Sequence, residues 1–405
     1  MDTPSRSSHC LRVVVAGGGV AALEAILALH ALAEDRATLE LVAPEPDFTY
    51  RPLAVAEPFR IADVRRFPLV MFTEEAGADL RQGTITAVDP AERVVECDTG
   101  EEISYDVLLL TLGARPRPAV ANALTFRGPE DDAAFSDLLE DALAGSVRRI
   151  VFAIPVEARW PLPLYELALL TGNYLTDRGT RDVSITLVTP EDAPLALFGA
   201  EASSAIRELL ELRDIELRLR TVPLRFEEGA LEVAPKASLP ADRVVALPRL
   251  DGPRLPGIPH DRDGFVSTDD FGRLLSEEDI YAAGDMTQFP LKQGGIATQQ
   301  ADAAATAIAA RSGVPIEPTP FRPILRGLLL TGMTSRYLRA EAGTRPSLDV
   351  QPLWWPPAKI VGRYLTPFLA AKAGLGETPA GPLRDAGISV EVELDPRGET
   401  RWSPI

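Results

Sequence analysis

Residues 12–25, RVVVAGGGVAALEA, decide how the chain begins to fold. The β-branched run at 12–16 predicts a buried parallel strand, and the Ala- and Leu-rich sequence that follows favours a helix. The turn between them has the pattern GxGxxA, in which the first glycine permits a tight turn and the second leaves room for a pyrophosphate. The start of the helix presents free N–H groups to the phosphates. The backbone predicted to bind a dinucleotide belongs to Gly17, Gly19, Val20, Ala21 and Ala22.

A second strand is predicted at 38–42, at the right distance to complete a βαβ unit. In such units an acid at the end of the second strand commonly binds the adenosine ribose. Ala43 stands at that end, and the first acid after it is Glu45. Glu45 is therefore the candidate ribose ligand, and the alternative is an acid in a solvated loop.

The composition limits the possible functions. With 405 residues and 46% hydrophobic residues, the chain is long enough for two or three domains. A net charge of −18 argues against nucleic-acid binding, because phosphates would be repelled. Residues 321–375 carry eight Lys/Arg and two Asp/Glu, so this segment is basic in an acidic chain. The start of the sequence has no pattern of a secretory signal, so we expect a cytoplasmic protein.

The chain has only two cysteines and three histidines, with no CxxC, HExxH or GxSxG pattern. A zinc site, a redox-active dithiol and a Ser-His-Asp arrangement are all disfavoured, and no metal is expected. The chemistry therefore points to a bound cofactor.

The rest of the chain repeats the α/β pattern. Three segments, 83–89, 93–97 and 102–110, predict a meander. A second β–loop–helix–β unit starts at 149, but prolines and an acid replace its phosphate-binding glycines. We expect an α/β fold with two Rossmann-like domains and a small C-terminal α+β unit. The predicted divisions are 11–116 with 250–318 for the first domain, which carries the glycine turn, 117–249 for the second domain, and 319–405 for the last unit.

Three stretches together resemble the FAD-dependent pyridine nucleotide-disulfide oxidoreductase superfamily, whose members have two dinucleotide-binding domains. They are GGGVAALEA at 17–25, YDVLLLTLGARP at 105–116 and IYAAGDMTQFP at 280–290. The resemblance covers roughly residues 11–320 and implies that FAD is the cofactor. It implies that Asp285 binds the ribityl chain, and that Thr111, Gly113 and Gly284 bring the backbone close to FAD.

Within the superfamily the chain looks similar to sulfide:quinone oxidoreductases and type II NADH:quinone oxidoreductases. WPLPLYELALL at 160–170 and KQGGIATQQADAAA at 292–305 carry this likeness. Trp160 stands about where the sulfide enzymes have a cysteine, and no cysteine follows Cys97. The nucleotide fingerprint of the NADH enzymes is also missing. The resemblance thus implies electron transfer through flavin without a dithiol, to a quinone or another small acceptor.

Six further residues are candidates for the flavin site. Glu166, expected at the start of a helix, could exchange a proton with the flavin. Trp160 could cover the flavin face, and Lys292 could add positive charge; a core tryptophan and a surface lysine are the alternatives. Gly295 and Ile296 would begin a helix pointing at the flavin ring, and Arg51 could contact pyrophosphate or flavin.

Residues 353–375 combine Trp, Lys and Arg with Ile360, Tyr364 and Phe368 at helical spacing. One interpretation is peripheral contact with the inner face of the membrane, and the other is a helix packed on the protein or in a homodimer. For the whole chain, two functions besides the leading one stay open. These are an NAD(P)H-dependent reductase with an atypical nicotinamide site and a non-enzymic flavin-binding protein.

Overall fold

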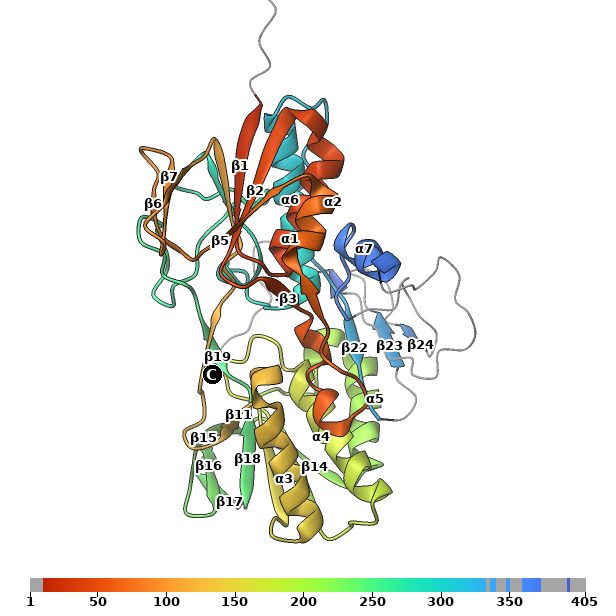
Figure 1. Ribbon diagram of the computed structural model, residues 1–405. Helices are drawn as coiled ribbons and strands as arrows, with labels where there is room; N and C mark the ends of the chain where they lie inside the picture. The colour runs from red at the N-terminus through yellow and green to blue at the C-terminus, as the bar shows by residue number, and fades with distance from the viewer. Residues whose placement is uncertain (1–9, 333–335, 340–346, 350–358, 373–391, 394–405) are drawn as a thin grey trace, which may run out of the picture.

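The computed structural model describes residues 10–332, 336–339, 347–349, 359–372 and 392–393, which form two lobes (Figure 1). The first lobe is built on a five-stranded sheet of order β20-β9-β1-β2-β5, in which all pairs are parallel. Its strands are β1 (Leu11–Ala16), β2 (Ala37–Ala43), β5 (Asp79–Gln82), β9 (Val107–Leu110) and β20 (Ile280–Ala282). Val13, Val14 and Val15 are fully buried, as expected for a central strand that is covered on both faces.

Helices cover one face of this sheet, and an antiparallel meander covers the other. The helices are α1 (Val20–Ala33), α2 (Leu69–Ala76) and α6 (Gly294–Arg311). The meander consists of β6 (Ile85–Asp89), β7 (Val94–Cys97) and β8 (Glu102–Ser104), and a short hairpin joins β3 (Asp47–Thr49) to β4 (Arg66–Pro68). The single strand expected at 102–110 is wrong. It is divided at residues 105–106, so that β8 ends the meander and β9 enters the parallel sheet.

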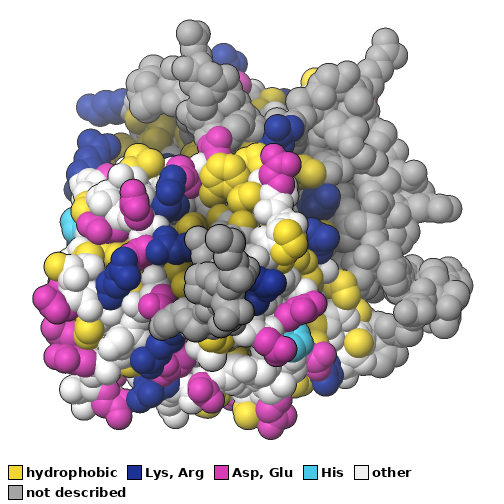
Figure 2. Space-filling model, turned by 90° about the horizontal axis from the view of Figure 1, so that it is seen from above, with side chains coloured by type: hydrophobic (Ala, Val, Ile, Leu, Met, Phe, Trp, Pro, Cys, Tyr) yellow, Lys and Arg dark blue, Asp and Glu magenta, His cyan; other side chains and the backbone are white. Residues whose placement is uncertain are grey.

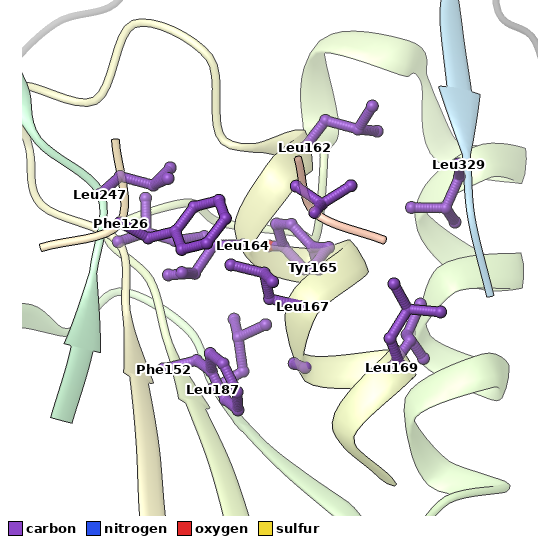
Figure 3. Packing of buried hydrophobic residues seen from close by; sticks show 14 of the residues in the cluster. Phe126, Phe152, Leu162, Leu164, Tyr165, Leu167, Leu169, Leu187, Leu247 and Leu329 are labelled. Atoms are coloured by element: carbon purple, nitrogen blue, oxygen red, sulfur yellow. The ribbon is translucent and has the colours of Figure 1, made fainter. Parts of the chain in front are cut away.

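The second lobe repeats this plan with a five-stranded parallel sheet of order β11-β18-β12-β13-β14. Its strands are β11 (Leu124–Thr125), β12 (Arg149–Ala153), β13 (Ser184–Val188), β14 (Ile215–Arg218) and β18 (Arg243–Ala246). Its helices are α3 (Asp132–Ala144), α4 (Leu162–Asp177) and α5 (Ala200–Glu211), and its meander is β15 (Val222–Glu227), β16 (Ala230–Ala234) and β17 (Ala237–Pro240). Leu164, Tyr165 and Leu167 of α4 point into its core, beside Phe152 and Leu187 of the sheet (Figure 3).

Two strands connect the lobes and pair with each other. They are β10 (Arg115–Arg117) and β19 (Arg249–Asp251), which run antiparallel. The divisions predicted at 116/117 and 249/250 fall within these strands. Two Rossmann-like units are confirmed by the fold.

The described part of the C-terminal unit lies beside both lobes (Figure 1). It comprises β21 (Ile324–Leu325), β22 (Gly327–Leu329), β23 (Arg336–Arg339), β24 (Ser347–Asp349), α7 (Leu365–Lys372) and β25 (Val392–Glu393). The helical spacing of Ile360, Tyr364 and Phe368 predicts a helix that includes Ile360, but α7 begins only at Leu365. Pro367 is therefore in its first turn, where a proline is tolerated. Ile360 therefore precedes the helix and is buried. Trp354 and Trp355 lie outside the described residues.

Acidic and basic side chains are interspersed over the face of the first lobe that Figure 2 shows. Among the described residues, no large patch of only basic or only acidic side chains is visible on this face. Among the described residues, no helix is long and apolar enough to cross a membrane.

Candidate flavin site

The three glycine-containing stretches meet at the carboxyl ends of β1, β9 and β20. A Cβ built on Gly17 would lie 2.6 Å from the carbonyl oxygen of Thr111, and one built on Gly284 would lie 3.2 Å from the Cβ of Ala21. Both glycines have positive φ, at 118° and 80°. The buried Thr111 hydroxyl donates a hydrogen bond of 2.6 Å to the Ala16 carbonyl and so ties the ends of β9 and β1 together. Stretches nearly 270 residues apart in sequence thus form one edge.

The start of α1 has the features of an anion site. The N-cap is Gly19, which has no side chain to cap the helix, and a Cβ there would meet nothing within 4 Å. Within the described residues the N–H groups of Gly18 and Gly19 donate no hydrogen bond. Open space, free amides and the positive end of the helix dipole suit a pyrophosphate. The residues here therefore fit the phosphate part of a dinucleotide.

Asp285 follows Gly284 at the end of β20, and its carboxylate has no hydrogen-bond partner among the described residues. Loss of water raises the pKa of Asp285, and the charge of Lys292 opposes this shift. An acceptor-only group without a donor fits the hydroxyls of a ribityl chain.

Lys292 is not a surface lysine. It is 6% exposed, and its ammonium lies 4.1 Å from the ring centroid of Phe265 and donates a hydrogen bond to the Thr287 carbonyl. Burial lowers the pKa of Lys292 to about 7, although Asp285 favours its charged form. Arg159 comes from the loop after β12 in the second lobe, and its guanidinium carbon lies 5.9 Å from the centroid of the same Phe265 ring. The two lobes thus place two cationic side chains around one ring next to Asp285.

The start of α6 is partly occupied by its own side chains. Gln293 caps the helix, because its side-chain oxygen accepts a hydrogen bond of 3.0 Å from the Ile296 N–H. The Ile296 N–H is therefore already used by Gln293, and contact of Ile296 with a cofactor stays a prediction. Gly294 has a packing role, because a Cβ there would come within 2.8 Å of Ile360. The Gly295 amide donates no hydrogen bond within the described residues.

Glu166 is the fifth residue of α4, so the expected position at the helix start is wrong. It is 1% exposed, and both of its oxygens lie 2.7 Å from the Lys359 ammonium. One oxygen also accepts a hydrogen bond of 2.7 Å from the Leu330 N–H. Burial raises the pKa of Glu166, and Lys359 opposes this shift; burial also lowers the pKa of Lys359. The pair lies next to Ile360 and so close to the start of α6.

Three other predicted residues take no part in the contacts described above. Glu45 is exposed, two residues beyond the end of β2. Arg51 pairs with Glu130 at 2.8 Å on the surface, so its guanidinium is held by protein. Trp160 packs edge-on against Phe198, with ring centroids 5.8 Å apart. This contact agrees with the alternative interpretation of Trp160 as a core residue.

The corresponding edge of the second sheet is closed. The turn from β12 to α4 contains no glycine, Pro163 has no N–H, and the Leu164 N–H donates to the Pro161 carbonyl. Glu191, just after β13, is buried and accepts a hydrogen bond of 2.6 Å from the Tyr165 hydroxyl. Burial raises the pKa of Glu191. Without a glycine turn, the backbone here does not form the nest of amides that a second pyrophosphate needs.

Sequence reasoning missed Lys359, Glu24 and Asp302. Glu24 is fully buried and caps α7, because its carboxylate accepts hydrogen bonds of 2.8 and 2.7 Å from the N–H groups of Tyr364 and Leu365. A signal was available for Glu24 and Asp302, since each is a single acid inside a helix of mostly apolar residues. Lys359 carried no such signal among the other basic residues of its segment.

Comparison with known proteins agrees with this geometry. A family model described as pyridine nucleotide-disulphide oxidoreductase matches residues 167–309. The matched stretch is about a third of the chain, over which the protein is similar to this superfamily, and the curated relatives that it matches are oxidoreductases.

Two curated relatives and one solved structure are similar to this chain. The ferredoxin–NAD(+) reductase component of the biphenyl dioxygenase system of Paraburkholderia xenovorans is 25% identical over 70% of this chain and 69% of that protein. The sulfide-quinone reductase of Aquifex aeolicus is 26% identical over 49% of this chain and 47% of that protein. A solved sulfide:quinone oxidoreductase from Aquifex aeolicus has the same fold, with a TM-score of 0.71, 20% identity, and coverage of 79% of this chain and 81% of that one.

Proposed function

We propose that the chain binds one FAD along the edge formed by β1, β9 and β20, and passes electrons through it to a quinone or another small acceptor. The observation that supports this most strongly is the meeting of Gly17 with Thr111 and of Gly284 with Ala21. FAD, when bound, supplies the chemistry of accepting an electron pair from a donor and passing it on. The protein positions it and controls its surroundings.

Each part of the cofactor has a candidate partner. The amides at the start of α1, from Gly18 to Ala22, would bind the pyrophosphate, and Glu45 the ribose. Asp285 would accept hydrogen bonds from the ribityl hydroxyls, with Gly113 and Gly295 allowing close approach of the backbone. Gly113 supports this role, since it has a φ of 68° and a Cβ there would meet nothing within 4 Å.

A redox dithiol has no part in this proposal. The two cysteines of the chain are Cys10 and Cys97. Cys10 precedes β1, at the opposite end of that strand from the glycines, and Cys97 is buried in the meander. Neither adjoins the proposed flavin edge, so a disulfide intermediate has no support.

Proton transfer to the acceptor would be carried out by buried side chains of the chain itself. Glu166 and Lys359 form one pair that can hold a proton near the start of α6, and Lys292 can hold another beside Asp285. Burial moves the pKa of each of these groups toward neutrality, as proton-transferring groups require.

A second candidate function is an NAD(P)H-dependent reductase. The similarity to a ferredoxin–NAD(+) reductase component favours it. The loss of glycines after β12 and the use of Glu191 by Tyr165 argue against ordinary nicotinamide docking.

The test begins with the yellow colour of the purified protein. We expect bound FAD in the parent and a large loss of it in Asp285→Ala, while Glu45→Gln tests the ribose contact. Anaerobic mixing with NADH, NADPH, sulfide and small thiols then identifies the donor, and quinones or oxygen test reoxidation. Flavin that is bleached rapidly by NADH would favour the reductase. Flavin that dithionite reduces but no acceptor reoxidises would favour a non-enzymic protein. A colourless protein that takes up no FAD would refute the proposal.

Membrane contact through residues 353–375 and a homodimer stay predictions. The packing of α7 argues for a docked helix, because Phe368 lies 5.0 Å from Phe72 of α2, measured between ring centroids. Flotation with phosphatidylglycerol vesicles, with and without residues 353–375, tests membrane contact, and light scattering tests the dimer.

A further inference from the structure

A cavity of about 450 Å³ lies between α6, the segment 319–326 and the segment 361–363. Its apolar wall includes Ala303 of α6, Phe321 and Val361. Its polar wall includes the guanidinium-bearing residues Arg322, Arg326 and Arg363. A cavity of this size with an apolar wall and a few grouped polar side chains is typical of a small-molecule site.

Two of the three arginines, Arg322 and Arg363, bring the cavity a positive charge that no described acid pairs with. Within the described residues, neither the Arg322 nor the Arg363 guanidinium forms an ion pair or a hydrogen bond. Both are exposed, whereas most other arginines of the described chain are paired with carboxylates. Two unpaired arginines beside a cavity, in a chain of net charge −18, favour an anionic ligand.

The single acid in the cavity wall, Asp302, lies against a second buried acid. It contacts the buried Glu24 on α1, whose oxygens already accept two N–H groups from α7. Asp302 Oδ1 is buried and accepts no hydrogen bond, which costs less for a neutral carboxyl group than for a carboxylate. Burial, together with the charge of Glu24, raises the pKa of Asp302 to about 8, and Arg363 opposes this shift. At neutral pH the arginine charge is therefore not offset.

We propose that this cavity binds an amphiphile with a phosphate head, the head between Arg322 and Arg363 and the apolar body against Phe321 and Val361. Guanidinium groups match phosphate oxygens in planar, paired hydrogen bonds. The apolar wall is the reason to expect a ligand with a hydrocarbon body, which inorganic phosphate lacks. This site is separate from the proposed flavin edge and does not depend on it. The head could belong to a membrane lipid or to a soluble phosphate ester.

The test uses octyl methyl phosphate, a phosphodiester with one negative charge throughout the pH range used. Calorimetric titration of the flavin-loaded full chain is expected to show one site, with much weaker binding of inorganic phosphate. The double variant R322Q/R363Q should bind about tenfold more weakly or worse, since each charged hydrogen bond is typically worth more than 1.4 kcal/mol. The matched control R181Q/R207Q removes two exposed arginines of the second lobe and should bind like the parent.

Asp302 gives a second readout that does not require loss of an arginine. As the pH rises through 8, Asp302 should ionise, and its charge, close to Arg363 and Glu24, should weaken binding. Asp302→Asn keeps a donor toward Glu24 but does not titrate, so its affinity should stay constant between pH 7 and 9. Equal affinity of the parent and R322Q/R363Q, or no binding by the parent, would overturn the proposal.

Flotation distinguishes the two sources of the phosphate. Phosphatidylglycerol vesicles that bind the parent but not R322Q/R363Q, with no binding of either to phosphatidylcholine, would assign the head to a lipid. Loss of octyl methyl phosphate binding in the variant, with no flotation of the parent, would assign it to a soluble ester. Both results support the cavity as the site.

Discussion

Replacing Lys359 by Met should release the segment 359–372 from the rest of the protein. The ammonium of Lys359 is the counter-charge of Glu166, which is 1% exposed, and the two side chains contact at 2.7 Å. Removing one partner leaves a buried carboxylate without compensation, which costs about 3–5 kcal/mol. This corresponds to about a 100- to 4,000-fold increase in the opening of the segment.

Hydrogen exchange of the peptide that covers 359–372, read by mass spectrometry, measures this opening. Lys372→Met is the matched control, because it removes the same charge from the same segment. Its partner Glu75 lies 3.8 Å away, and both side chains are about half exposed, so we expect less than about 1 kcal/mol, or about fivefold.

The pH dependence of the Lys359→Met variant has a defined sign. Without Lys359, burial raises the pKa of Glu166 further above its unfolded value. The neutral form is tolerated at low pH, and stability is lost as the pH rises through the folded pKa. The excess exchange should therefore be small at pH 5 and large at pH 8.

A double variant, E166Q/K359M, keeps an acceptor for the Leu330 N–H but removes both charges, so most of the protection should return. Exchange in Lys359→Met that equals that of Lys372→Met at every pH would refute the reasoning. So would a double variant no better protected than Lys359→Met.

Three other changes test different parts of the structure. Gly17→Ala should lower both the melting temperature and the flavin content, because its Cβ would lie 2.6 Å from the Thr111 carbonyl oxygen at a φ of 118°. Gly19→Ala is the control: a Cβ there meets open space, so this variant should lower the flavin content alone. Lys292→Met should raise the free energy of unfolding at pH 6–7, because a folded pKa of about 7 costs about 1.4 kcal/mol for each unit below 10.5. This gain in stability should vanish toward pH 10.5. Urea titrations at several pH values measure the gain, and an equal gain at all pH values would contradict the prediction. Tyr165→Phe removes one of two hydroxyl donors to the buried Glu191, the other being Thr189 at 2.9 Å, and should cost about 1–3 kcal/mol in the same assay; a cost near zero would contradict this prediction.

The parts of the fold that local sequence encodes could be predicted. The strand, the glycine turn and the helix at 12–33 are adjacent in sequence, and the glycines at 17 and 284 are needed where backbones approach closely. The ion pair of Glu166 with Lys359 joins residues 193 positions apart, and no periodicity marks such a contact. The start of helix α7 was predicted too early, because the apolar spacing from Ile360 to Phe368 includes residues 360–364, which form bends and no helix. Its face is set by packing on α1 and α2, which sequence spacing does not reveal.

The short segment 359–365 has a consequence for how the molecule is assembled. Within seven residues it provides the counter-charge for a carboxylate of one lobe, Glu166, and the amide donors for a carboxylate of the other, Glu24. Both acids are synthesised long before this segment leaves the ribosome. Until it docks, each lobe must keep its acid in contact with water or protonated, so the final closure of both cores waits for the same seven residues. A defect there would be felt in the two halves of the molecule at once.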